Sequence, residues 1–145
     1  MPSTSIWIHL IWATKNRRPI LTKDLRNTLF EHIKENALLK EIQLDTIGGV
    51  CDHVHVLVRV FPDQQVSRIV QLIKGESSHW VNSRNMVPFK FEWQDEYMAV
   101  SLSRSAVYLV RQYIRNQEVH HRKKTTAEEW QRILAEAGIQ GVETP

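Results

Sequence analysis

Residues 53–60 read HVHVLVRV, and this alternation predicts a β-strand with two chemically different faces. One face consists of valine alone, at Val54, Val56, Val58 and Val60. We expect that face to pack beneath helices and to form part of the core. His53 and His55 point to the opposite face, because side chains two residues apart on a strand lie on the same side.

The hydrophobic patterns on either side of this strand predict the element order β-α-β-β-α-β-α. The expected elements of the first half are a strand at 5–14, a loop at 15–19, a helix at 24–40, and strands at 41–50 and 53–60. The second half is expected to contain a helix at 66–82, a strand-like segment at 89–101 that bends near Gln94-Asp95, a helix from Ser103 or Ser105 to about residue 121, and a short helix at 127–137. Thr22 is the expected N-cap of the first helix, and Asp63 or Ser67 that of the second. The first six elements match the split βαβ pattern, so the predicted fold is α+β, with a ferredoxin-like antiparallel sheet.

The length of 145 residues is enough for one domain with its own core and too short for two. We expect the core at about 5–122 and a C-terminal appendage at 123–145. The composition, 42% hydrophobic and 24% charged, is that of an ordinary globular protein, and no apolar run approaches the length of a membrane span. The N-terminus shows no secretory signal, and the one cysteine, Cys51, fits a reducing compartment, so we expect a cytoplasmic protein with no membrane partner.

The formal net charge of +3 allows a nucleic-acid partner without requiring one. Basic residues cluster in the turn at 15–18 and around 111–124, whereas we expect the acidic residues, including Glu128 and Glu129, to lie elsewhere. A solvated surface is the simplest explanation of such clusters. From charge placement, the residues that we expect to contact DNA are Lys15, Arg17, Arg18, Arg115, Arg122 and Lys123.

Tyr113 and Gln117 are four residues apart on a predicted helix and therefore share one face. Taken singly, each motif has a structural explanation: histidines that are hydrogen-bonded on a half-exposed strand, a tyrosine ring packed on the sheet, and a surface glutamine. Taken together, they indicate a reactive site. Two imidazoles and an amide oxygen around a divalent cation, with a phenol beside them, are the groups needed to break a phosphodiester through a tyrosyl intermediate.

The candidate metal ligands are therefore His53, His55 and Gln117, and the candidate nucleophile is Tyr113. A neutral set of nitrogen and oxygen donors suits Mg²⁺ or Mn²⁺ better than a structural Zn²⁺. A covalent phosphotyrosine retains the bond energy, which implies strand transfer rather than plain hydrolysis. His120 and His121 have three open explanations: contact with DNA phosphate, solvation, or service as an alternative ligand.

Five segments of the chain resemble the single-tyrosine transposases of the HUH endonuclease superfamily, which mobilise small bacterial insertion sequences, and the related REP-associated tyrosine transposases. The resemblance covers roughly residues 5–122. The segments are WATKNRRPIL at 12–21, DHVHVLV at 52–58, IKGESSHWVN at 73–82, WQDEYMAVSLS at 93–103 and YIRNQEVHHRK at 113–123.

This resemblance implies a ferredoxin-like catalytic core in which His53, His55 and Gln117 hold the metal and Tyr113 is the nucleophile. It implies cleavage of single-stranded DNA with a 5′-phosphotyrosine link and a free 3′-OH. It also implies a homodimer that binds subterminal hairpins, in which the tyrosine helix of one subunit completes the site of the other in many members. Assembly in cis or in trans is left open by the sequence.

Two other functions compete with the transposase. A non-catalytic module on the same fold would bind single strands by stacking bases on aromatic residues, for which Trp7, Trp12, Trp93 and Tyr97 are available. A hydrolytic metallonuclease would use water as the nucleophile, and Tyr113 would only pack.

Overall fold

A four-stranded antiparallel sheet in the order β2-β3-β1-β4 is the centre of the computed structural model, which describes residues 2–121 and 124–139. The strands are β1 (Trp7–Ala13), β2 (Gln43–Gly49), β3 (His53–Arg59) and β4 (Met98–Leu102). The helices are α1 (Lys23–Leu39), α2 (Val66–Ser83), α3 (Val107–Arg115), α4 (Gln117–His121) and α5 (Thr126–Glu136), with short 3-10 turns at Lys15–Arg17 and Arg104–Ala106. The predicted α+β class and its antiparallel sheet are confirmed.

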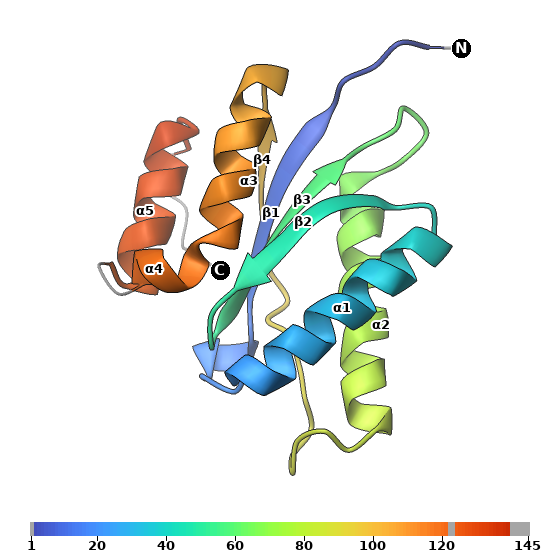
Figure 1. Cartoon of the computed structure of the whole chain (residues 1–145), viewed down its shortest axis with the longest axis vertical. Helices are drawn as coiled ribbons and strands as arrows, with labels where there is room; N and C mark the ends of the chain where they lie inside the picture. Colours follow the sequence, from blue (N-terminus) through green and yellow to red (C-terminus); the bar gives the residue numbers. More distant parts are fainter. Residues whose placement is uncertain (1, 122–123, 140–145) are drawn as a thin grey trace.

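Helices cover both faces of this sheet, with α1 and α2 on one side and the C-terminal helices, including α3 and α5, on the other (Figure 1). The valine face of β3 lies against α1 and α2, where Val54, Val56 and Val58 are fully buried, as predicted. Burial of each such side chain stabilises the fold by about 1.5–3 kcal/mol. No helix within the described residues is both long and apolar enough to cross a bilayer.

Strand β1 is buried on both faces, which confirms its continuous apolar pattern. Leu10 and Trp12 belong to the core beneath α1 and α2. Ile11 and Ala13 belong to a second cluster, which β1 and β4 form with α5. The central strand therefore connects the two apolar layers of the molecule.

One of the two predicted helix caps is correct. The Thr22 hydroxyl accepts a hydrogen bond from the Leu25 amide at 3.4 Å and caps α1. Asp63 and Ser67 do not cap α2, which has Gln65 at its N-cap position and no side-chain cap. The preceding turn closes on itself instead, because the Phe61 amide donates to the Gln64 side chain at 2.9 Å.

The predicted strand over 89–101 is wrong in its first part, because only Met98–Leu102 forms a strand and residues 89–97 follow an irregular path. The segment meets the end of β1 only at an isolated bridge between Thr14 and Trp93, and side chains of α2 also bind its backbone. Asn82 accepts from the Phe91 amide at 2.7 Å and donates to its carbonyl at 3.0 Å. Lys74 donates to the carbonyl oxygens of Gln94 and Asp95.

The single helix predicted to end near residue 121 is divided into a 3-10 turn, α3 and α4. The division between α3 and α4 lies at Asn116, whose φ of −101° and ψ of 23° leave the helical region. The Asn116 amide closes α3 by donating to the Gln112 carbonyl at 3.0 Å, and its carbonyl accepts from the Val119 amide at 3.0 Å in the next turn. Asparagine is suited to such a junction because it is favoured at helix ends.

Gly48 on β2 allows α3 to approach the sheet closely. A Cβ atom at this position would lie 2.3 Å from the Ile114 carbonyl oxygen, which is backbone and has no flexible end to move. We predict that Gly48→Ala displaces α3 and lowers the free energy of unfolding by about 1–3 kcal/mol, as overpacking does elsewhere. Chemical denaturation of the purified variant measures this loss.

Gly75→Ala is the matched control, because Gly75 lies inside α2 and a Cβ there meets no atom within 4 Å. We expect this variant to be more stable than the parent chain by about 0.5–1 kcal/mol, since alanine loses less conformational entropy in a helix. Equal stability of the two variants would contradict the packing argument at Gly48.

Candidate active site

The imidazoles of β3 lie on the sheet face that α3 and α5 cover. His53 and His55 are both 0% exposed, as is Leu57, the next residue on that face. In the register with β1, Ala13 pairs with His53 and Ile11 with His55. The predicted separation of histidines from valines is therefore correct, although the histidines are fully buried rather than half-exposed.

Both imidazoles are oriented by a hydrogen bond at Nδ1. The Nδ1 atom of His53 lies 2.8 Å from Asp52 Oδ1, and the Nδ1 atom of His55 lies 2.8 Å from His9 Nε2. Both Nε2 atoms consequently face the site interior. Each is buried without a hydrogen bond among the described residues, and each lies within ion-pair distance of Glu129. Metal-binding histidines are held in this manner, with a partner at one ring nitrogen and the other directed at the ion.

Tyr113 and Gln117 reach the same point from α3 and α4. Gln117 is buried, its Nε2 donates to Glu129 Oε1 at 3.1 Å, and its Oε1 has no hydrogen-bond partner among the described residues. The Tyr113 hydroxyl donates to the same carboxylate oxygen, and its ring centroid lies 5.7 Å from that of His55. The four predicted residues thus converge within one chain.

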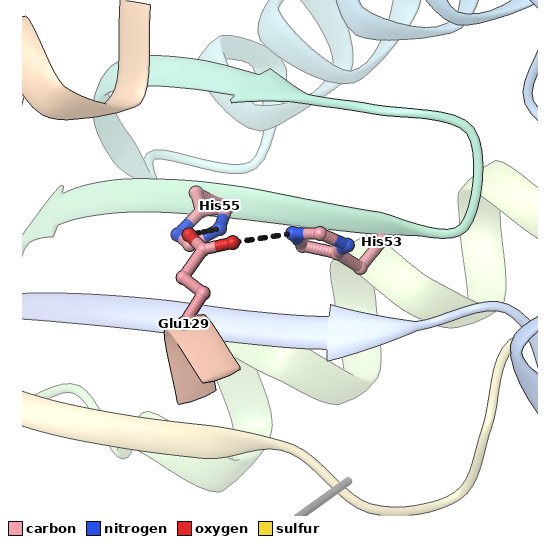
Figure 2. Close-up of side chains that lie close together, drawn as sticks. All are labelled: His53, His55 and Glu129. Atoms are coloured by element: carbon pink, nitrogen blue, oxygen red, sulfur yellow. Dashed lines mark ion pairs between the residues drawn. The ribbon is translucent and has the colours of Figure 1, made fainter. Parts of the chain in front are cut away.

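Glu129 is the site residue that the sequence reasoning missed (Figure 2). Its side chain extends from α5, and its carboxylate lies between the two imidazoles, with Oε1 2.9 Å from His55 Nε2 and Oε2 3.4 Å from His53 Nε2. It is 2% exposed, so the expectation that the acidic tail residues lie elsewhere is wrong for Glu129 and fits only the exposed Glu128. The available signal was a carboxylate on the buried face of an amphipathic helix, beside Trp130 and Ile133.

His121 also contacts this carboxylate, because its Nε2 is hydrogen-bonded to Glu129 Oε2. Its ring centroid lies 4.8 Å from that of His53. The solvated interpretation of His121 is therefore wrong. The side chain of His120 lies outside the described part of the structure.

The electrostatics of the site centre on the buried carboxylate. Burial opposes ionisation, but the neighbouring imidazoles of His121, His53 and His55 hold the pKa of Glu129 far below its usual range. Burial lowers the pKa of His55 to about 4, whereas for His53 the Asp52 and Glu129 carboxylates outweigh burial and raise the pKa. Burial and the neighbouring carboxylate both raise the pKa of Tyr113, so its phenol remains a hydrogen-bond donor.

The donor atoms fit a divalent cation. Ligand atoms of His53, His55 and Glu129 all lie within 4.8 Å of one another. Glu129 oxygens lie 2.9 Å from His55 Nε2 and 3.4 Å from His53 Nε2, close to the roughly 3 Å that separates adjacent ligands of an ion bound at about 2.1 Å. The Gln117 oxygen is a further donor, buried and unpaired among the described residues. Buried polar atoms are rarely left without partners, and a bound cation would account for the Nε2 atoms of His53 and His55 and for the Gln117 oxygen.

The basic residues expected to contact DNA have different surroundings. Lys15 lies 3.2 Å from Glu92, the guanidinium of Arg17 lies 4.5 Å from the ring centroid of Trp130, and that of Arg18 lies 4.6 Å from the ring centroid of Phe89. Arg115 is exposed. Arg122 and Lys123 lie outside the described residues. The structure thus places the turn at 15–18 next to α5 through the contact of Arg17 with Trp130.

Comparison with known protein families assigns the chain to one of them. Residues 2–117 match the family described as "Transposase IS200 like". The chain belongs to this family. It is therefore a tyrosine transposase of the HUH class, as its sequence segments predicted.

Individual relatives agree with this assignment. The chain is 24% identical over 114 residues to the ISDra2 transposase TnpA of Deinococcus radiodurans, an alignment that covers 75% of this chain and 81% of that protein. A crystal structure described as that of a transposase from Deinococcus radiodurans R1 is 26% identical in sequence to this chain, with a TM-score of 0.64. The alignment covers 80% of this chain and 93% of that one. A REP-associated tyrosine transposase bound to a REP hairpin shares the fold, with a TM-score of 0.62 at 15% identity over 100% of this chain and 92% of that one.

Asp52 orients His53, and this contact predicts the effect of its removal. We expect Asp52→Asn to weaken Mn²⁺ binding by about 10–100-fold, because outer carboxylates fix the tautomer and raise the basicity of a ligand imidazole. Isothermal titration of the DNA-free protein with Mn²⁺ measures the change. Asp63→Asn, an exposed position in the loop before α2, should bind Mn²⁺ like the parent chain. Equal affinity of the two variants would rule out the orienting role.

Proposed function

We propose that this transposase cleaves and rejoins single-stranded DNA with Tyr113 as its nucleophile and with a divalent cation held by His53, His55 and Gln117. The observation that carries the proposal is the convergence of a phenol, two imidazole nitrogens and an amide on one buried point of a single chain. His53, His55 and Gln117 would hold a cation there, Mg²⁺ or Mn²⁺, which would supply neutralisation of the phosphodiester and polarisation of its phosphoryl oxygen.

The residues of the chain supply the remaining steps. Asp52 and His9 hold the imidazoles in place, and the buried position of the site excludes bulk water. The Tyr113 oxygen forms a bond to phosphorus as the bond from phosphorus to the 3′ oxygen breaks. The phenol loses its proton, the 3′ oxygen gains one, and the products are a 5′-phosphotyrosine and a free 3′-OH. Attack by a 3′-OH of another strand reverses the step and rejoins DNA.

The proposed partner is single-stranded DNA with subterminal hairpins, bound in the cytoplasm by a homodimer. A relative of the same fold is described in complex with a REP hairpin, which supports this class of partner. The convergence of the four predicted site residues within one chain supports assembly in cis. In that assembly, the second subunit of the proposed homodimer is not needed to complete the donor set.

The competing aromatic-stacking function is disfavoured by burial. Trp7, Trp12 and Trp93 are 7%, 0% and 7% exposed, and helices cover both faces of the sheet. These three rings pack in the apolar interior and offer no surface on which bases could stack. The fourth candidate, Tyr97, is partly buried and packs against the same core as Trp12 and Trp93.

Tyr113→Phe tests the nucleophile. We expect the variant to form no covalent adduct with a labelled single-stranded oligonucleotide in Mn²⁺, because it lacks the attacking oxygen, and to bind the oligonucleotide as before. A denaturing gel separates the protein-linked band from free DNA. Tyr108→Phe is the matched control, since Tyr108 is on the same helix and is 62% exposed, and it should form the adduct normally.

The same gel distinguishes the other functions. Free cleaved product without an adduct, in both the parent chain and Tyr113→Phe, would establish a hydrolytic nuclease. Absence of any cleavage by the parent chain in Mn²⁺ would favour a binding module.

The basic turn at 15–18 yields a prediction about salt dependence. We expect the double variant Lys15→Glu, Arg18→Glu to bind single-stranded DNA more weakly and to reduce the slope of log affinity against log salt by about 1.4, which corresponds to two phosphate contacts. Fluorescence anisotropy at several salt concentrations gives the slope. The control variant Lys40→Glu, Arg68→Glu makes the same charge change at the C-cap of α1 and within α2, away from the site. Identical slopes would remove the turn from the DNA-binding surface.

A further inference from the structure

Helix α5 packs in a defined position beside the active site. Its buried side chains Trp130, Ile133 and Leu134 pack on Ile11, Ala13 and Met98 of β1 and β4. The Thr126 hydroxyl lies 3.3 Å from an oxygen of Asp52, the residue that orients His53. These contacts, together with the stacking of Arg17 on Trp130, hold the helix over the histidine face of the sheet.

This position of α5 directs the Glu129 side chain into the centre of the site (Figure 2). Oε1 accepts hydrogen bonds from the Tyr113 hydroxyl and from Gln117 Nε2, and lies 2.9 Å from His55 Nε2. Oε2 contacts the ring nitrogens of His121 and His53. One carboxylate thus touches each of the four residues assigned to catalysis or metal binding.

A buried carboxylate is costly unless a cation compensates it. Within residues 2–121 and 124–139, the recorded ion-pair partners of Glu129 are all histidines: His53, His55 and His121. The two β3 imidazoles have their Nδ1 atoms engaged and direct Nε2 at the carboxylate. Two imidazole nitrogens and a carboxylate oxygen directed at one another form a set of ligands to which a divalent cation would supply the compensating charge.

We propose that Glu129 is a fourth protein ligand of this cation in the DNA-free protein, and that α5 thereby covers the active site in cis until DNA displaces it. The inference rests on the proposed metal site and extends it. The Tyr113 hydroxyl is aimed at Glu129 Oε1, and the scissile phosphate must lie within reach of the same hydroxyl. The phosphate and the Glu129 carboxylate therefore compete for one place.

This ligand changes the charge of the site. His53, His55 and Gln117 are neutral donors, so the cation would keep both positive charges, whereas Glu129 removes one. The DNA-free protein then holds its cation more tightly. Entry of DNA replaces one anionic oxygen ligand by another, which avoids leaving a bare cation in a buried site.

Metal binding without DNA tests the ligand. We expect Glu129→Gln to weaken Mn²⁺ binding to the full chain at least about tenfold, because glutamine keeps the shape of the side chain and loses its charge. Electron paramagnetic resonance of free Mn²⁺ gives the affinity. Glu128→Gln is the control, since it makes the same change at the adjacent, exposed residue of α5 and should bind Mn²⁺ like the parent chain. Unchanged affinity in Glu129→Gln would overturn the assignment.

The affinity for DNA tests whether α5 covers the active site. At saturating Mn²⁺, we expect Glu129→Gln to bind a fluorescent single-stranded oligonucleotide several-fold more tightly than either the parent chain or Glu128→Gln, because its docked α5 no longer competes with phosphate. Equal or weaker binding than Glu128→Gln would overturn the covering role. Thermal unfolding of each variant confirms that it is folded.

Neither readout needs catalysis. If the parent chain formed no adduct while Glu129→Gln still lost Mn²⁺ affinity and gained DNA affinity, the tyrosine mechanism would fail and the role of α5 would stand. If Glu129→Gln bound Mn²⁺ normally and lost the adduct, Glu129 would be a proton acceptor for Tyr113 and the ligand assignment would be wrong.

Discussion

The two-residue repeat of β3 is the constraint on which both layers of the molecule depend. It directs Val54, Val56 and Val58 into the core with α1 and α2, and it directs His53 and His55 into the layer with α3 and α5. A slip of one residue against either neighbouring strand would exchange the two sets, because every side chain would change face. Imidazoles would then lie in the apolar core, so the pairing that stabilises the sheet is also the pairing that positions the site.

The second requirement is the close approach of α3 to the sheet. No Cβ atom fits at Gly48 beneath the Ile114 carbonyl, and the adjacent Tyr113 is thereby held above His55. The break at Asn116 then separates Tyr113 from Gln117. The sequence predicted both side chains on one continuous helix. In the structure they reach the same carboxylate from two helices, because a separation of four residues across this junction still places both side chains on the same side.

Sequence reasoning succeeded where a local repeat or a local cap determines the structure, as in the alternation of β3 and the Thr22 cap. It failed where distant segments decide the outcome. Residues 89–97 take their irregular path because Asn82 and Lys74 of α2 bind their backbone, and no periodicity in the segment encodes those partners. Glu129 was missed for a related reason, since its partners on β3 precede it by about half of the chain and only its place on the apolar face of α5 marked it as unusual.

The position of α5 and the protonation of Tyr113, the proposed nucleophile, depend on the same contact. While Glu129 accepts the Tyr113 hydrogen bond, burial and the carboxylate keep the pKa of the phenol above its ordinary value, and the phenolate needed for attack is suppressed. Departure of the carboxylate would remove its own contribution to that suppression, although burial would still raise the pKa, and would leave the hydroxyl beside the proposed cation ligands. In the proposed mechanism, the group that DNA must displace is therefore also a group that helps to keep the Tyr113 phenol protonated, which would favour cleavage only when DNA is bound.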